Sequence, residues 1–209
     1  MKMIKRTILQ QRENDFFYPI RDKLSYALLL LNAAQLLLLE DAYEDSSGDN
    51  AFMKLVVGKM RRVFFYKKEK YFSVAFPLIV RTDQSNVTEI LTDTNKKLNH
   101  SMISHMKSIL NDQNFRNKPS LRDYPVDETD ENNDAIYLLE EILLFEPSYI
   151  RYDCDTKNQN GAIHPLYHLD INYSQYGTYK LGLCSNIDND YFENIQNIET
   201  ECLFLVDKK

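Results

Sequence analysis

The stretch YIRYDCD, residues 149–155, determines how the second half of the chain is interpreted. Apolar and polar residues alternate in it, which is the pattern of a β-strand that buries one of its faces. Two later stretches alternate in the same way, YHLDINY at residues 167–173 and TYKLGL at residues 178–183. Short loops between successive strands favour antiparallel neighbours. The sequence therefore predicts an antiparallel sheet in the C-terminal half.

Side chains on a strand alternate between the two faces of its sheet, so the residues of these three stretches can be sorted. One face is apolar and includes Ile150, Tyr152, Leu169 and Leu181. The other face is polar and collects Arg151, Asp153, Asp155, His168, Asp170 and Lys180.

The polar face has the ingredients of a catalytic site. Asp153, His168 and Asp170 could hold a divalent metal, which prefers hard oxygen ligands with at most one or two nitrogens. His168 could instead act as a general base. Lys180 or Arg151 could stabilise negative charge that develops on a phosphate. Together these residues suit metal-assisted hydrolysis, plausibly of a phosphodiester.

A purely structural interpretation explains the same residues and is favoured by the sequence alone. An antiparallel sheet with one solvated face alternates apolar and polar residues, and pairs of opposite charge across strands stabilise it modestly. His164 and His168 have the spacing of a zinc-binding helix, but Pro165 argues against a helix there. His164 is therefore expected to be a loop residue without a special role.

The N-terminal half is predicted to be mainly helical. Residues 19–43 carry apolar side chains at helical spacing and then at nearly every position, as in a helix in the middle of a core. Residues 52–63 are expected to form a second helix, and residues 85–113 a long amphipathic one. Between them, residues 70–80 are expected to form a strand that Pro77 places at a sheet edge or interrupts.

The chain divides on this basis into three parts. Residues 1–113 form the mainly helical part, residues 114–134 an acidic linker or long loop, and residues 135–209 the sheet part; a single compact domain is the alternative. Residues 137–145 are ambiguous between helix and strand. The fold class predicted is α+β, with a helical N-terminal half and an antiparallel β-sheet in the C-terminal half.

A basic and aromatic stretch at residues 59–72 raises a further hypothesis. It interleaves six basic residues with five aromatic ones, a combination that binds single-stranded nucleic acid through phosphate contacts and base stacking. The net charge of −6 opposes this hypothesis. The candidate nucleic-acid-binding residues are Arg61, Arg62, Lys67 and Lys68.

Composition excludes several protein classes. The chain is 44% hydrophobic and 27% charged, as in ordinary globular proteins, so it is not disordered throughout. Its most apolar run, residues 27–39, is too short and too polar to span a membrane. Three widely spaced cysteines without a CxxC pair argue against a zinc knuckle and favour buried free thiols in a reducing cytoplasm.

Residues 141–183 contain the motif RYD…HPLYHLD and resemble a group of uncharacterised bacterial proteins with this core. Arg151, Asp153, His164, His168 and Asp170 carry the motif. The resemblance implies a cytoplasmic accessory or effector component linked to mobile elements or phage defence. It implies no established activity.

Two functions follow as expectations. The first is a non-catalytic accessory protein that has no cofactor and binds a protein partner or a second copy of itself. It rests on the absence of a complete catalytic motif and on apolar content beyond one core. The alternative is a hydrolase or nuclease that uses a divalent metal on the polar sheet face. A convergent group of side chains favours the hydrolase, and a flat, wet surface favours the accessory protein.

Overall fold

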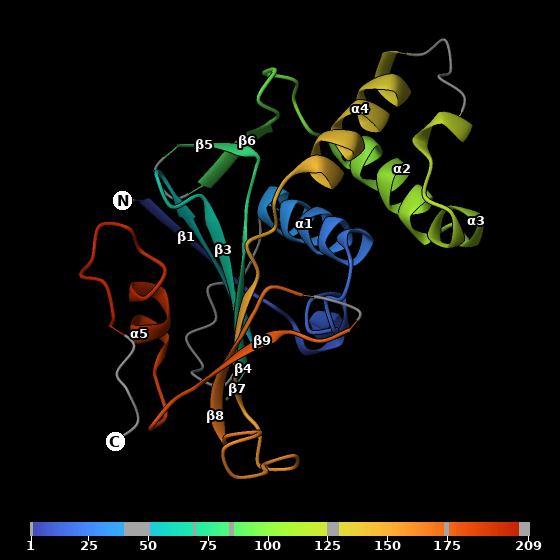
Figure 1. Ribbon diagram of the computed structural model, residues 1–209. Coiled ribbons are helices and arrows are strands. Elements are labelled where there is room, and N and C mark those ends of the chain that lie inside the picture. The colour runs from blue at the N-terminus through green and yellow to red at the C-terminus, as the bar shows by residue number, and fades with distance from the viewer. Residues whose placement is uncertain are drawn as a thin grey trace.

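The computed structural model describes residues 2–39, 51–68, 70–83, 86–124, 130–173 and 176–204. Its central element is an antiparallel seven-stranded sheet in the order β1-β2-β3-β4-β7-β8-β9, which draws on both halves of the chain (Figure 1). A separate two-stranded sheet pairs β5 with β6. The strands of the large sheet are β1 (Lys2–Thr7), β2 (Phe52–Val57), β3 (Arg62–Lys67), β4 (Lys70–Ala75), β7 (Ile150–Cys154), β8 (Tyr167–Ile171) and β9 (Tyr179–Gly182).

The prediction of a helical N-terminal half is wrong, because strands β1 to β4 lie there. The helix expected at residues 52–63 is β2, a turn and the start of β3. Gly58 lies in that turn with a φ of 129°, a backbone conformation that residues other than glycine rarely adopt. β3 is buried on both faces: Phe65 packs in one core and Phe64 in the other. Such a strand is a continuous apolar run, which periodicity cannot distinguish from a buried helix.

The helix expected at residues 19–43 is confirmed as α1 (Lys23–Leu38). Asp22 caps it by accepting a hydrogen bond from the backbone N–H of Ser25 at 2.7 Å. Most of its side chains are buried, and it packs between the large sheet, α2 (His100–Asn111) and α4 (Asp130–Leu144) (Figure 1). The main core therefore lies between one sheet face and these three helices.

The long helix expected at residues 85–113 is present only in its second half. β5 (Ile79–Asp83) and β6 (Asn86–Leu91) form the small sheet, and α2 begins after Asn99, which accepts a hydrogen bond from the Met102 N–H. The strand expected at residues 70–80 is β4, and Pro77 separates it from β5.

Residues 114–134 are not a featureless linker. They contain most of α3 (Gln113–Asn117), the short helix η2 (Leu121–Asp123) and the start of α4. The ambiguous residues 137–145 fall almost entirely in α4, so they are helical. Residues 40–43, the end of the helix expected at residues 19–43, lie outside the described residues.

The opposite face of the sheet carries a second, smaller core. Helix α5 (Asn189–Asn194) packs there through Phe192, against Phe64 and Tyr71. Glu193 of α5 is buried and accepts hydrogen bonds from Lys54 Nζ at 2.7 Å and 2.9 Å. The sheet is thus covered by α1 and its neighbours on one side and by α5 on the other (Figure 1).

Within the described part of the chain, no helix is both long and apolar enough to cross a membrane. The expectation of buried thiols holds for none of the three cysteines in full: Cys154 is half-buried, and Cys184 and Cys202 are exposed.

Candidate metal centre

The three predicted C-terminal strands are neighbours, and their register confirms the predicted polar row. Arg151 on β7 pairs with Asp170 on β8, which pairs with Lys180 on β9, and Asp153 pairs with His168. The row is not a solvated surface. Arg151 also pairs with Phe72 on β4, a residue of the main core, so the polar residues lie on the same sheet face as α1.

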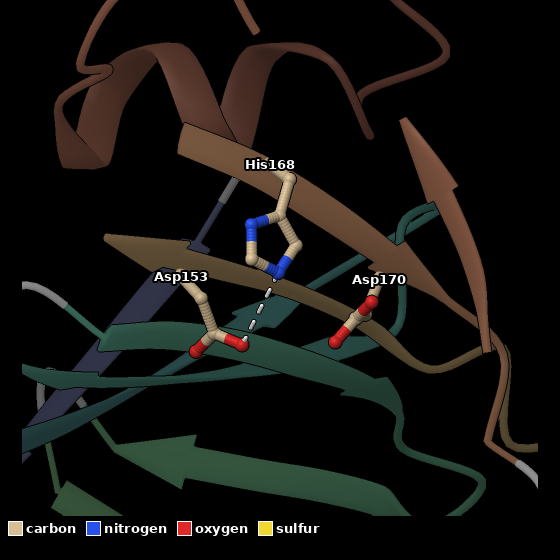
Figure 2. Close-up of side chains that lie close together, drawn as sticks. All are labelled: Asp153, His168 and Asp170. Carbon is tan, nitrogen blue, oxygen red and sulfur yellow. Dashed lines mark ion pairs between the residues drawn. The ribbon is translucent and has the colours of Figure 1, made fainter. Parts of the chain in front are cut away.

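Asp153, His168 and Asp170 converge on one point between β7 and β8 (Figure 2). One potential ligand atom from each residue lies within 4.8 Å of the other two. His168 Nε2 is 3.9 Å from Asp153 Oδ2. The side chains of His168 and Asp170 are 1% and 2% exposed, whereas that of Asp153 is 17% exposed. These three residues form what we call the Asp–His–Asp cluster.

The orientation of His168 is set by the loop before β8. Its Nδ1 is 2.9 Å from the carbonyl oxygen of Pro165, which can only accept a hydrogen bond. The Nδ1 atom therefore carries a proton, and in the neutral imidazole Nε2 keeps its lone pair. A backbone carbonyl behind a histidine is the usual arrangement that fixes a metal-binding tautomer.

Arg151 connects the two carboxylates of the cluster. Its Nε donates to Asp153 Oδ2 at 2.6 Å, and its Nη2 donates to Asp170 Oδ2. Asp170 Oδ1 accepts a further hydrogen bond from Thr178 Oγ1 at 2.8 Å. Burial alone would lower the pKa of Arg151, but the interactions with Tyr149 and the two carboxylates outweigh it and raise that pKa. The guanidinium is thus a fixed positive charge.

Lys70 adds a second positive charge that the sequence analysis did not assign to this site. It pairs in register with Asp153 across β4 and β7. Burial, followed by the nearby charge of Arg151, lowers the pKa of its ammonium group. Sequence reasoning missed Lys70 because no local pattern signals the pairing of β4 with β7.

His164 lies in a second network beside the cluster, although a residue without a role was expected. Its ring packs edge-on against that of His168 at a centroid distance of 4.8 Å. Lys180 Nζ donates to its Nδ1 at 2.9 Å, so Nε2 carries the proton and donates to Asp155 Oδ2 at 3.1 Å. Hydrogen bonds from Asn158 first, and then from His164, lower the pKa of Asp155 to about 2 against the effect of desolvation. Lys180 therefore contacts His164, at the outer end of the polar row.

The two arginines of the basic and aromatic stretch lie in different environments. Arg62 is buried, and its Nη1 donates to Ser73 Oγ and to the Ser148 carbonyl, both at 2.8 Å. Arg61 is exposed and lies 3.9 Å from Asp93.

The two lysines of the stretch lie at the turn between β3 and β4. Lys67 pairs with Glu13 at 2.5 Å, and Lys68 is exposed with a φ of 45°. Phe64, Phe65 and Tyr66 are core residues, so their rings are not available for base stacking. Nucleic-acid binding by the four basic residues stays a prediction.

The Asp–His–Asp cluster fits a divalent cation by donor type. Three ligands of a small octahedral ion lie about 3 Å apart when adjacent and about 4.2 Å apart when opposite, so donors that lie within 4.8 Å of one another would have to draw together by up to about 2 Å on binding. Each carboxylate oxygen has two lone-pair sites, so an oxygen that accepts from Arg151 can still bind an ion. Arg151 can therefore keep its hydrogen bonds to Asp153 and Asp170 while the same carboxylates bind a cation.

Comparison of the chain with models of known protein families, with curated proteins and with solved structures finds no match in any of the three. The geometry of the cluster is therefore the basis on which a function can be assigned.

Proposed function

We propose that the protein is a hydrolase that depends on a divalent cation and acts on phosphate esters. The observation that carries the proposal is the convergence of Asp153, His168 and Asp170, with the free Nε2 lone pair of His168 directed at the two carboxylates. Two carboxylates and one imidazole form a ligand set that Mn²⁺, Zn²⁺ and related ions accept. A bound cation supplies Lewis acidity and an activated water.

The charges around the cluster favour an anionic substrate. Arg151 and Lys70 already balance the two carboxylates, so a divalent cation would leave the site with a surplus of positive charge. A partly buried site with this surplus stabilises the negative charge that develops on a phosphoryl group. Lys180 lies at the outer end of the row and can contact a second phosphate oxygen. This distribution of charge supports the assignment of the substrate class.

Thermal unfolding with and without metal tests the proposal. The protein is heated in EDTA and in Mg²⁺, Mn²⁺ or Zn²⁺, beside the variants His168→Ala and Asp170→Asn. A ligand that binds only the native state adds about 2.7 kcal/mol at a hundredfold excess over its Kd, which is readily measured. His100→Ala is the control, since His100 is an exposed histidine on α2. The quantity compared is the difference in melting temperature between metal and EDTA for each variant. This difference cancels any loss of stability that the substitution itself causes.

We expect the metal to raise the melting temperature of the parent protein. This rise should be lost in His168→Ala and Asp170→Asn and kept in His100→Ala. Cleavage of bis(p-nitrophenyl) phosphate by the metal-loaded protein, with the same variant dependence, then establishes the reaction class. If none of the three metals changes the melting temperature, the protein is not a hydrolase of this kind.

The accessory role is the second candidate, and one observation supports it. Tyr137 and Leu144 lie seven residues apart on α4 and are 56% and 76% exposed. Large apolar side chains exposed on one side of a helix are typical of protein-protein contacts. Three results together would support this role: the folded protein does not respond to metal, it forms dimers in light scattering, and the variant Leu144→Glu is monomeric. The link to mobile elements or phage defence stays a prediction.

A further inference from the structure

A polar pocket of about 440 Å³ opens between α1, α2, α3 and the segment that precedes α1. None of the side chains that line it belongs to the Asp–His–Asp cluster or to the network around His164. A pocket of this size lies within the range that binds small metabolites. We call it the Asn32 pocket, after the residue on α1 that forms its most buried polar wall.

Asn32 presents a hydrogen-bond acceptor that has no partner among the described residues. The residue is only 3% exposed, and its Nδ2 donates to the Asp15 carbonyl oxygen at 2.7 Å. That bond fixes which end of the amide is which, so the atom left over is the carbonyl oxygen Oδ1. A buried acceptor is normally satisfied. Oδ1 is closed off from solvent as the structure stands, so a ligand in the pocket that carries an N–H or O–H donor would satisfy it once the neighbouring side chains shift.

The lining of the pocket includes two positively charged side chains. Lys107 uses one of its three donors on Gln35 Oε1 at 3.1 Å, and burial lowers the pKa of its ammonium group. Arg116 also lines the pocket, and its Nη1 donates to the Leu110 carbonyl. The carboxylate of Asp15 at the rim is paired with Arg12 at 3.2 Å. The lining thus has two cations that can contact an anionic group.

The lining of the pocket also includes apolar and aromatic side chains. Leu28 and Pro19 line the pocket, and the ring of Tyr18 is held in place because its hydroxyl donates to the Ser25 carbonyl at 2.8 Å. A planar base can pack against such a surface. An inorganic phosphate alone would leave most of the volume unfilled.

We propose that the Asn32 pocket binds a nucleoside 5′-monophosphate that carries an exocyclic amino group. The phosphate contacts Lys107 and Arg116, the base lies along Tyr18 and Leu28, and the amino group donates to Asn32 Oδ1. The proposal is independent of the hydrolase function, because it uses none of the residues of the metal centre.

Isothermal titration with adenosine 5′-monophosphate tests this proposal. EDTA is present throughout, so that the Asp–His–Asp cluster contributes nothing and its failure as a metal centre would not affect the result. Lys107→Met keeps the apolar stem of the side chain and removes the charge. Lys59→Met is the matched control, since Lys59 is 77% exposed and does not line the pocket.

The expected result is one bound nucleotide per chain, with affinity reduced about tenfold or more in Lys107→Met and unchanged in Lys59→Met. Purine riboside 5′-monophosphate lacks the amino group and is expected to bind about tenfold more weakly than the adenosine nucleotide. The proposal is overturned if millimolar nucleotide fails to bind, or if Lys107→Met binds it as well as the parent. Equal affinity for the two nucleotides would overturn the assignment of the donor to Asn32.

Discussion

Gly182 on β9 lies directly against the ring of Pro165, and a Cβ added at Gly182 would come within 3.0 Å of Pro165 Cγ. Pro165 in turn provides the carbonyl oxygen that binds His168 Nδ1. The absence of a side chain at Gly182 thus lets the loop before β8 approach β9 closely. The position of this loop in turn sets the orientation of the His168 imidazole.

Gly182→Ala is expected to move the Pro165 carbonyl by a few tenths of an ångström and to weaken its bond to His168. The metal-induced rise in melting temperature should then shrink, and the ¹⁵N chemical shifts of the His168 ring should change. Pro165→Ala in the same chain removes the ring atom that clashes, so the double variant should regain part of both properties. No change in the ring nitrogen shifts of Gly182→Ala would contradict the positioning role.

Arg151→Met is expected to destabilise the protein by about 3 kcal/mol, because it leaves the buried carboxylate of Asp170 without its cation. Urea unfolding in EDTA measures the loss. Arg81→Met is the control: its pair with Glu89 is exposed to solvent, and such pairs contribute little to stability. If the cluster binds a cation, Mn²⁺ should restore part of the stability in Arg151→Met. Equal losses in the two variants would show that Asp170 does not need the guanidinium.

Tyr152→Phe is expected to change how stability depends on alkaline pH. Burial raises the pKa of the Tyr152 phenol from about 10 in the unfolded chain to about 12. A raised pKa of this kind leaves stability intact below pH 10 and removes it as the pH rises toward 12. The phenylalanine variant loses the hydrogen bond to Asn186 and starts slightly less stable.

Urea unfolding at pH 8, 10 and 11 gives the comparison for Tyr152→Phe, and absorbance at 295 nm reports when phenols ionise. The deficit of the variant should shrink as the pH rises above 10. Tyr149 and Tyr173, whose pKa values burial also raises to about 12, are present in both proteins and cancel in the difference. A deficit that stays constant from pH 8 to pH 11 would place the Tyr152 phenol in contact with solvent.

Glu193→Ala is expected to loosen α5 from the sheet. Glu193 accepts from Lys54 Nζ and, at 2.5 Å, from the Tyr66 hydroxyl, so its removal leaves a partly buried ammonium and a buried phenol without their acceptor. We expect a loss of about 3 kcal/mol, measured by thermal unfolding. Glu199→Ala removes an exposed partner of Lys59 and should have an effect of less than about 1 kcal/mol. Similar melting temperatures for the two variants would contradict the role of Glu193 in holding α5 on the sheet.

The C-terminal strands that sequence reasoning predicted correctly have one apolar and one polar face. β7 alternates between Tyr152, packed under α5, and the polar residues on either side of it, so its period of two is visible in the sequence. β3 has no such contrast, because Phe64 and Phe65 are both fully buried on opposite faces. Residues 86–91 fall within the expected long helix although they form β6, and the turn that separates them from α2 contains Asn95 with a φ of 62°.

The same distinction separates the predicted from the missed residues of the site. The register of two adjacent strands was enough to bring Asp153 and His168 together. Lys70 could not be placed, because its pairing with Asp153 joins distant parts of the chain. His164 was missed because it lies in a loop and its two partners come from different parts of the chain: Asp155 follows β7, and Lys180 lies on β9. Only its short spacing from His168 drew attention to it.

The pairing of β4 with β7 has a consequence for how the protein folds. β1 to β4 can pair as soon as their residues leave the ribosome, but the free edge of β4 must wait for β7, which comes after β5, β6, α2, α3, η2 and α4 in the chain. Until then the sheet has an open edge with aromatic side chains beside it, the situation in which chains aggregate. Contacts between such distant segments also slow folding. The Asp–His–Asp cluster lies on β7 and β8 alone, so the pairing of these two strands is enough to assemble it; closure of the β4 edge then brings Lys70 alongside Asp153 and removes the exposed edge.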